Sequence, residues 1–186
     1  MNIYKKNLNQ LKQNSVYNET MEHDACGVGL VASTEGVKSR KVVEYGIQAL
    51  KAVWHRGAID ADGKTGDGAG IHIEIPKDFF IEKIEITGHR HEDSDLCVGM
   101  IFLPRNDYQG QEQCRIIVES ELTKKNFNIY GWSQVPVNPS VLGEKAENTR
   151  PEITQVLFKH NDKKVIGKNL ERVLYETRRK IENEAL

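Results

Sequence analysis

The sequence has 186 residues, of which 38% are hydrophobic and 28% are charged, and its formal net charge is −1. This composition is typical of a globular protein, and because acidic and basic residues balance, neither nucleic acid nor an anionic membrane is expected as a partner. No apolar run reaches the roughly 18 residues that a membrane-spanning helix needs. The first 25 residues are polar and lack the apolar stretch of a secretory signal, so we expect a cytoplasmic protein.

The three cysteines, Cys26, Cys97 and Cys114, are expected to be free thiols in a reducing compartment. None has the C-x-x-C spacing of zinc or iron–sulfur sites, so no metal site is expected within this chain. Cys97 lies in an apolar run and Cys114 on the apolar face of a predicted helix, which places both in the core. The triplet His89–His91 near Cys97 could suggest a metal site, but its charged surroundings favour a solvated loop.

In chain order, residues 1–21 form a polar leader, and the apolar spacing after it predicts a mixture of strands and helices. The expected strands are 26–32, 71–76, 96–104, 126–137 and 152–160. The expected helices are 38–54, one containing 114–122, and one from about residue 167, whereas 82–95 is expected to be a charged loop. The continuous apolar run 96–104 is typical of a strand buried on both faces. The mixture predicts an α+β fold in which helical layers enclose sheet.

Residues 55–70, HRGAIDADGKTGDGAG, combine glycine with aspartate and allow several interpretations. The segment Gly63–Thr65 is similar to the end of a phosphate-binding loop, but Ala58 stands where that motif needs glycine, and a strand pattern follows instead of a helix. The run GDGAG lacks the spacing of a dinucleotide-binding motif. DADGKT is similar to half of a calcium loop, except that its glycine is misplaced and Lys64 occupies a ligand position. Local chemistry favours a tight structural turn in which glycine supplies a positive φ.

Cys26 stands in the segment EHDACGVGLVAS, directly before Gly27. A free cysteine is usually a small, inert, buried hydrophobic residue. If the chain is cut between Ala25 and Cys26, the cysteine gains an α-amino group with a pKa of about 7.7–8.0, which can accept the thiol proton. A neighbouring glycine would let a substrate approach closely. Local chemistry alone leaves both interpretations open.

Several segments together, in order and spacing, resemble the class II glutamine amidotransferase domain at the start of glutamate synthases. They are EHDACGVGLVAS, ALKAVWHRGAIDADGKTGDGAGIHIEIPKDFF, VGMIFLPR, GWSQVPVNPSVLGEKA, PEITQVLF and ERVLYETRRKIE. That domain has the N-terminal nucleophile hydrolase fold. The resemblance implies that residues 26–186 form the N-terminal part of a four-layer αββα sandwich, and that residues 1–25 are a propeptide removed autocatalytically.

The resemblance also implies a reaction and its partners. Cys26 would attack the side-chain amide of L-glutamine, releasing ammonia and then glutamate, with Gly27, Arg56 and Asp67 in supporting roles. Arg56 would position backbone or carboxylate groups through its planar set of donors. In the full-length enzyme the ammonia would reach 2-oxoglutarate and be reduced through FMN and an iron–sulfur cluster. A small reductase subunit or ferredoxin would bring the electrons, and NADPH, NADH and ferredoxin all stay open as donors.

Two groups of that family are not found after Cys26 in this sequence: the arginine that binds the glutamine carboxylate and the Asn-Gly pair of the oxyanion hole. Loss of an oxyanion hole costs on the order of a hundredfold or more in rate. We therefore expect residues 1–186 alone to be an inactive fragment that retains its leader. Two alternatives remain: another class II glutamine amidotransferase, or a degenerate, non-catalytic truncated module.

Overall fold

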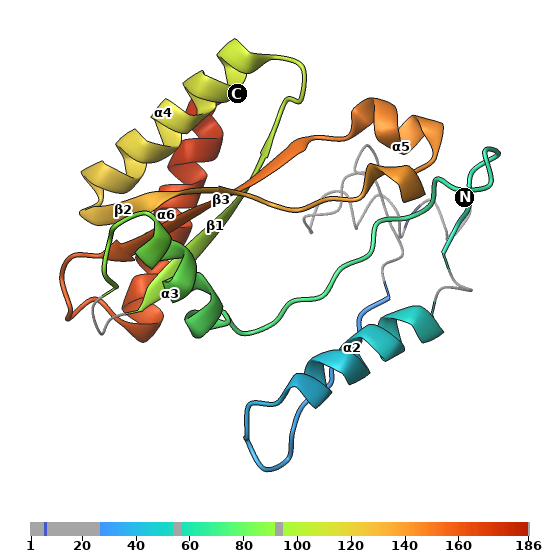
Figure 1. Ribbon diagram of the computed structural model, residues 1–186, viewed down its shortest axis with the longest axis horizontal. Helices are drawn as coiled ribbons and strands as arrows, with labels where there is room; N and C mark the ends of the chain where they lie inside the picture. Colours follow the sequence, from blue (N-terminus) through green and yellow to red (C-terminus); the bar gives the residue numbers. More distant parts are fainter. Residues whose placement is uncertain (1–5, 7–26, 54–56, 92–94, 186) are drawn as a thin grey trace. The chain divides into compact units, whose positions relative to one another are not determined.

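The computed structural model describes residue 6 and residues 27–53, 57–91 and 95–185 (Figure 1). The chain divides into two compact units, Met1–Arg56 and Gly57–Leu186.

The first unit contains helix α2 (Arg40–Ala52), in agreement with the predicted helix. Ser39 begins the helix, because its side chain accepts a hydrogen bond from the Lys41 backbone N–H at 3.1 Å. The strand predicted at 26–32 is wrong for its described part, since residues 27–32 form no regular structure and Val28 is 95% exposed. A strand needs a hydrogen-bonded neighbour, and among the described residues none pairs with this segment.

The second unit is built on an antiparallel sheet of three strands in the order β1-β3-β2. They are β1 (Leu96–Leu103), β2 (Phe127–Gln134) and β3 (Glu152–His160), and all three were predicted from the sequence. The strand predicted at 71–76 is wrong: this segment has no regular structure, and Ile71 and Ile73 are both exposed. Its side chains alternate between apolar and polar, as in a strand. However, no described segment forms the backbone hydrogen bonds of a sheet with it.

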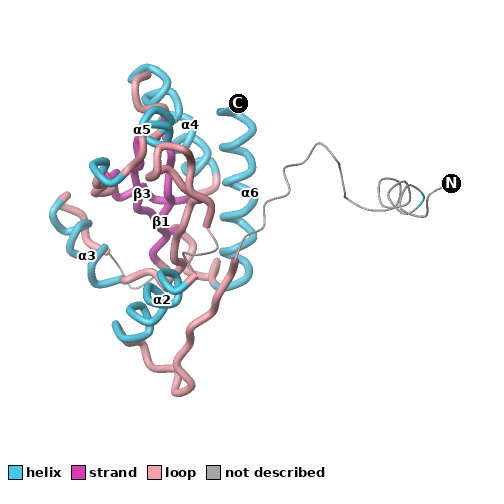
Figure 2. Tube along the Cα trace, turned by 90° about the vertical axis from the view of Figure 1, so that its right-hand side faces the viewer, coloured by secondary structure: helices cyan, strands magenta, loops and turns pink. Residues whose placement is uncertain are grey.

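Helices α4 (Tyr108–Lys124) and α6 (Gly167–Ala185) cover one face of this sheet (Figures 1 and 2). The apolar spacing in the sequence predicted both helices correctly. The Phe127 and Phe158 rings meet edge to face there, 5.2 Å between centroids. The buried residues of this cluster are Cys97, Val118, Leu122, Phe127, Val156, Phe158 and Leu170.

A short helix, α3 (Lys77–Ile86), packs on the opposite face of the sheet. Its Phe80 and Ile84 contact a second buried cluster, whose strand residues are Leu96, Tyr130 and Leu157. The sequence did not predict this helix, and part of it was expected to be a charged loop. The remainder of this face is open, because Met100 is 46% and Phe102 is 64% exposed. The prediction that β1 is buried on both faces therefore holds only for its first residues.

The mixture of helices with an antiparallel sheet confirms the α+β class. Among the described residues, no helix is both long enough and apolar enough to cross a membrane.

Gly99 tests how tightly the α4–α6 face of the sheet is packed. A Cβ at this position would lie 2.8 Å from Val156 Cγ1, and Val156 is buried. We expect Gly99→Ala to lower the free energy of unfolding by about 1–3 kcal/mol through overpacking. Urea unfolding measures this. Ile116→Ala, at an exposed position of α4, is the control and is expected to shift stability by no more than about 0.5 kcal/mol. Equal effects of the two substitutions would contradict the packing.

Cys97 tests the burial of β1. Desolvation, together with the nearby Asp95 carboxylate, raises the pKa of its thiol from 9.0 to about 12. Because the thiolate is the reactive form, we expect iodoacetamide at pH 8 to modify native Cys97 at least tenfold more slowly than the half-buried Cys114. Both thiols should react alike in denaturant. Because the folded thiol is the weaker acid, the fold should lose stability as pH rises above about 9. Equal native rates, read by peptide mass mapping, would contradict this.

Candidate functional site

The predicted site residues fall on both units. Cys26 and Arg56 lie outside the described residues. Gly27 is exposed at the start of the described part of the first unit, and Asp67 lies in the second unit. The described surroundings of the predicted site are therefore those of the loop that follows Arg56.

That loop is an ordered turn. Ile59 and Gly66 form an antiparallel bridge. Inside it the Asp60 backbone N–H donates to the Thr65 carbonyl at 2.7 Å, and the Gly63 N–H donates to the Asp60 carbonyl at 2.9 Å. Gly63 has a φ of +69°, which glycine adopts without strain. This is the tight turn that local chemistry favoured.

Asp67 closes the base of the turn. Its Oδ2 accepts a hydrogen bond from the Ala58 backbone N–H at 2.9 Å, and its own N–H donates to the Ala58 carbonyl at 3.3 Å. No helix follows the turn, as residues 68–76 have no regular structure. A phosphate-binding loop needs a helix N-terminus at that point, so the structure does not support this interpretation.

Asp62 is the most heavily bonded residue of the turn. Its Oδ1 accepts from the backbone N–H groups of Lys64 at 2.9 Å and Thr65 at 2.7 Å, and its Oδ2 accepts from the Thr65 hydroxyl at 2.5 Å. With the Thr65 hydroxyl as the largest cause, these bonds lower the pKa of Asp62 from 3.8 to about 2.

These bonds also bear on the calcium interpretation of the turn. The carboxylate of Asp62 is engaged by donors of its own chain, and Asp60 Oδ2 pairs with Lys145 Nζ at 2.5 Å. A calcium loop needs free carboxylate oxygens. Among the described residues, no three histidine, cysteine, aspartate or glutamate side chains are grouped so that they could hold a metal ion.

Helix α5 (Glu144–Thr149) contacts the turn through Lys145, which pairs with Asp60. Gly143 precedes this helix and offers no side chain as a cap. A Cβ on Gly143 would clash with Thr65 Oγ1 and Asp62 Oδ2. Glycine is needed here because the turn approaches closely. The sequence did not predict this contact.

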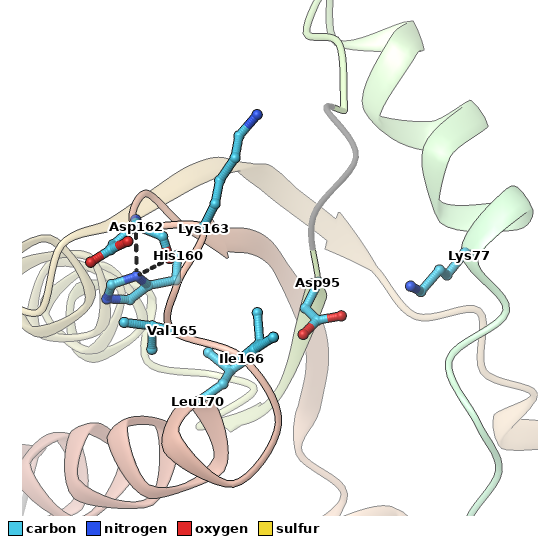
Figure 3. Close-up of a pocket in the computed structure, with 8 residues that line it drawn as sticks. All are labelled: Lys77, Asp95, His160, Asp162, Lys163, Val165, Ile166 and Leu170. Atoms are coloured by element: carbon cyan, nitrogen blue, oxygen red, sulfur yellow. Dashed lines mark hydrogen bonds between the residues drawn. The ribbon is translucent and has the colours of Figure 1, made fainter.

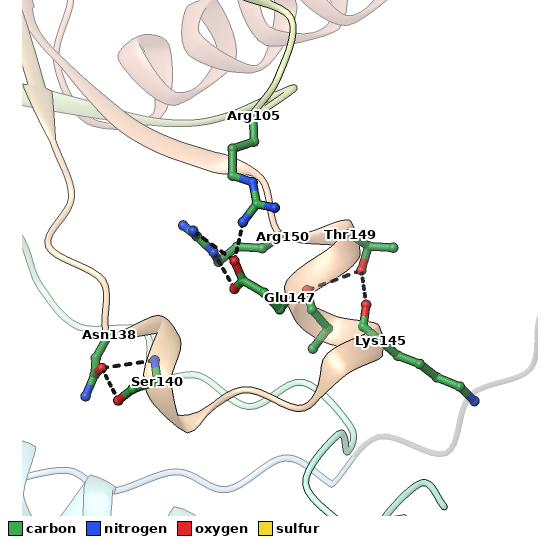
Figure 4. A network of polar contacts seen from close by, with 8 residues as sticks. Arg105, Asn138, Ser140, Lys145, Glu147, Thr149 and Arg150 are labelled. Carbon is green, nitrogen blue, oxygen red and sulfur yellow. Dashed lines mark hydrogen bonds and ion pairs between the residues drawn. The ribbon is translucent and has the colours of Figure 1, made fainter. Parts of the chain in front are cut away.

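On its other side, α5 is tied to the end of β1 (Figure 4). Glu147 accepts hydrogen bonds from Arg105, which follows β1, and from Arg150 Nε at 2.9 Å. Arg150 and then Arg105 lower the pKa of the Glu147 carboxyl, which stays charged at neutral pH. Just before α5, the Asn138 side chain caps the short helix η2 (Pro139–Val141).

A separate cavity of about 170 Å³ lies near the start of α6 (Figure 3). His160 Nδ1 lies 3.1 Å from the backbone nitrogen of Asp162 there. The lining residues are Lys77, Asp95, His160, Asp162, Lys163, Val165, Ile166 and Leu170. They carry charges of both signs but no hydroxyl or thiol, so this cavity does not hold the cysteine, serine or threonine nucleophile that is usual for attack on an amide.

The two histidines of the triplet His89–His91 contact neighbouring side chains of the second unit. His91 Nδ1 lies 3.0 Å from the Tyr130 hydroxyl, and His89 Nδ1 lies 3.1 Å from the Thr87 hydroxyl. Both imidazole rings contact the Tyr130 ring edge to face. The two histidines therefore pack against the α3 side of the sheet.

Comparison with known proteins defines the class. The family model for glutamine amidotransferases of class II matches residues 26–186, so its match begins at Cys26 and covers the whole described sheet. The chain belongs to the class II glutamine amidotransferase family.

Within that family, its relatives include glutamate synthases. It is 52% identical over 179 residues to the glutamate synthase [NADPH] large chain of Azospirillum brasilense, which covers 96% of this chain and 12% of the relative. It is 37% identical to the ferredoxin-dependent glutamate synthase of Pyropia yezoensis (87% of this chain, 10% of the relative). It is 36% identical to the glutamate synthase [NADH] of Saccharomyces cerevisiae (77% of this chain, 7% of the relative). The chain thus spans about a tenth of the length of these relatives.

The cysteines of this chain do not fit an iron–sulfur cluster. Such clusters are commonly held by four cysteine thiolates, and the sequence has three cysteines. Cys97 is buried in β1 with its pKa raised to about 12, so it is a neutral thiol. Any cluster used by a longer enzyme would need ligands from elsewhere.

Asp67 tests how the turn is closed. We expect Asp67→Ala to speed hydrogen exchange of the Ala58 amide several-fold, because its acceptor is lost. Asp67→Asn keeps a side-chain oxygen that can accept the same hydrogen bond and should retain most of the protection. NMR-detected exchange measures both. Unchanged exchange in Asp67→Ala would contradict the role of this carboxylate.

Proposed function

We propose that this chain is the glutaminase portion of a glutamate synthase and hydrolyses L-glutamine to glutamate and ammonia within the longer enzyme. The family match from Cys26 to residue 186, together with 52% identity to a glutamate synthase large chain, is the observation that carries this proposal. Closeness to three kinds of glutamate synthase favours this branch over other class II amidotransferases.

In the proposed mechanism, residues 1–25 are a propeptide whose removal leaves Cys26 as the first residue. The neutral α-amino group accepts the thiol proton, and the thiolate attacks the side-chain carbonyl carbon of glutamine. The tetrahedral intermediate collapses with breakage of the C–N bond, and the leaving nitrogen takes the proton and departs as ammonia. Water then attacks the γ-glutamyl thioester, which releases glutamate and restores the thiol.

The supporting roles follow from position and chemistry. Gly27 lets the substrate approach beside the nucleophile. Arg56 positions backbone or carboxylate groups through its planar donors. Asp67 holds the turn that begins two residues after Arg56, which its hydrogen bond to Ala58 supports.

The four-layer αββα arrangement is part of the same proposal. The open part of the α3 face, with Met100 and Phe102 exposed, would be covered by the second sheet of the sandwich. Residues 27–32 and 71–75, which have no regular structure in the described part of the chain, would supply strands to it.

In the complete enzyme, the ammonia would be transferred to 2-oxoglutarate in a cytoplasmic reaction. FMN and an iron–sulfur cluster, held by other parts of the longer chain, would supply the reducing electrons when bound. A small reductase subunit or ferredoxin would deliver those electrons, as the names of the NADPH, NADH and ferredoxin relatives suggest for them.

Covalent labelling tests the nucleophile. In the full-length enzyme we expect a thiol-reactive glutamine analogue to label Cys26 stoichiometrically and to abolish ammonia release. Cys26→Ser should lose the label and at least 99% of glutaminase activity. Cys114→Ser, which removes a half-buried thiol from α4, is the control and should label normally. A correctly folded enzyme without a label at Cys26 would refute the proposal and favour a non-catalytic module.

A further inference from the structure

We infer that the second unit holds a binding site for a small carboxylate ligand, in a cavity beside the start of α4 where β1 and β2 end and β3 begins. The cavity has a volume of about 440 Å³, within the range of about 300–1,000 Å³ that small-molecule sites occupy. Its wall includes Arg105 after β1, Arg115 of α4, Trp132 of β2 and Thr154 of β3. The family resemblance assigns none of these residues to the reaction, so this inference does not depend on the proposed function.

Two buried polar atoms in the wall of this cavity lack a hydrogen-bond partner. They are the Thr154 hydroxyl oxygen and the Arg115 Nε, and among the described residues no other buried side-chain nitrogen or oxygen is left without one. Thr154 is only 5% exposed. Folded proteins pair nearly all such groups, because a buried group without a partner has lost its hydration and gained nothing in return. Since both exceptions line one cavity, they indicate a partner that enters it.

The guanidinium of Arg115 is arranged to bind a carboxylate. Its Nη1 donates to Glu112, and its central carbon lies 5.9 Å from the centroid of the Trp132 ring. These contacts leave the side edge, Nε with Nη2, whose two parallel N–H groups match the two oxygens of a carboxylate. Glu112 is exposed, so water screens this ion pair and the arginine keeps its attraction for a second anion.

The wall of the cavity is fixed by contacts within the fold. The Trp132 Nε1 donates to Glu119 at 2.7 Å, which orients the indole ring. The buried Gln111 side chain donates to the carbonyls of Pro104 and Arg105 at 2.9 and 3.2 Å, which holds the segment between β1 and α4. A wall that is already ordered reduces the entropy that a ligand loses on binding. The ring of Trp132 offers flat apolar surface for the body of such a ligand.

The charges of the lining favour a ligand with a single negative charge. The lining has two arginines, Arg105 and Arg115, and one acidic residue, Glu152. Arg105 already donates to Glu147, which leaves Arg115 as the main partner for a ligand anion. The Glu152 carboxylate, which accepts a hydrogen bond from Gln134 at 2.6 Å, opposes a second negative charge. This balance matches a carboxylate better than a phosphate dianion.

Calorimetric titration of the full-length enzyme with benzoate tests the site, because benzoate joins a carboxylate to a flat apolar ring. We expect saturable binding that is about tenfold weaker for benzamide, its neutral analogue, and for phenyl phosphate. Arg115→Ala should weaken benzoate binding about tenfold. Arg178→Ala is the matched control, because Arg178 also pairs with a glutamate, Glu182, and lies over a ring, that of Tyr175. It should leave benzoate binding within about twofold of wild type.

Thr154→Val separates binding from folding, because it keeps the volume of the side chain and removes the unpaired hydroxyl. We expect it to weaken benzoate binding about threefold or more, while the unfolding midpoint stays the same or rises. Thr177→Val is its matched control. Thr177 is also buried, but its hydroxyl donates to the Val173 carbonyl at 2.7 Å. Thr177→Val should therefore lower the unfolding midpoint and leave benzoate binding unchanged.

Several results would overturn the inference. Benzoate binding that survives Arg115→Ala would place the ligand elsewhere, and equal binding of benzamide would show that the negative charge is not recognised. Tighter binding of phenyl phosphate would contradict the assignment of a carboxylate. Failure of benzoate to bind the full-length enzyme would show that other parts of the longer chain fill the cavity. A lower unfolding midpoint in Thr154→Val, with benzoate binding unchanged, would show that an enclosed water is the partner of the hydroxyl.

Discussion

The central strand of the sheet, β3, is the constraint on which the second unit depends. It pairs with both β1 and β2, and its side chains alternate between the two buried clusters. Val156 and Phe158 face α4 and α6, whereas Leu157 faces α3. Full burial of such a side chain contributes about 1.5–3 kcal/mol, so this strand anchors both layers of helix at once. Gly99 opposite Val156 lets the strands and the side chains above them approach closely.

From this sheet, polar contacts lead through α5 to the turn that contains Asp60. Arg105 leaves the end of β1 and binds Glu147 of α5, and Lys145 of the same helix pairs with Asp60 of the turn. Hydrophobic packing stabilises the sheet, whereas hydrogen bonds to charged groups stabilise the turn.

The sequence predicted what depends on local spacing. All three strands of the sheet, together with α2, α4 and α6, follow from apolar periodicity, and Cys97 was assigned correctly to the core. The strands predicted at 26–32 and 71–76 failed because a strand also needs a partner, and periodicity says nothing about partners. Helix α3 was not predicted because its two buried residues, Phe80 and Ile84, stand among charged residues. These obscured the helical spacing of four positions between them.

The candidate site was predictable only in part. The family resemblance singled out Cys26, Gly27, Arg56 and Asp67, and the family itself is confirmed. The link between Asp60 and Lys145 could not be read from the sequence, since 85 positions separate them and each stands in a different segment, with nothing in either segment to indicate that the two meet. The one local signal was Gly143, a glycine with an ordinary φ of −79°, which indicates a close neighbour rather than a special backbone conformation.

The central claim is that Cys26 becomes the first residue of a glutaminase and uses its own α-amino group as the base. Mass spectrometry of the N-terminal peptide from active full-length enzyme tests it most directly. The account predicts a peptide that begins at Cys26 and carries a free α-amino group, with residues 1–25 absent. Fully active enzyme that retains residues 1–25 would contradict it, because Cys26 would then have a peptide bond where the base is required.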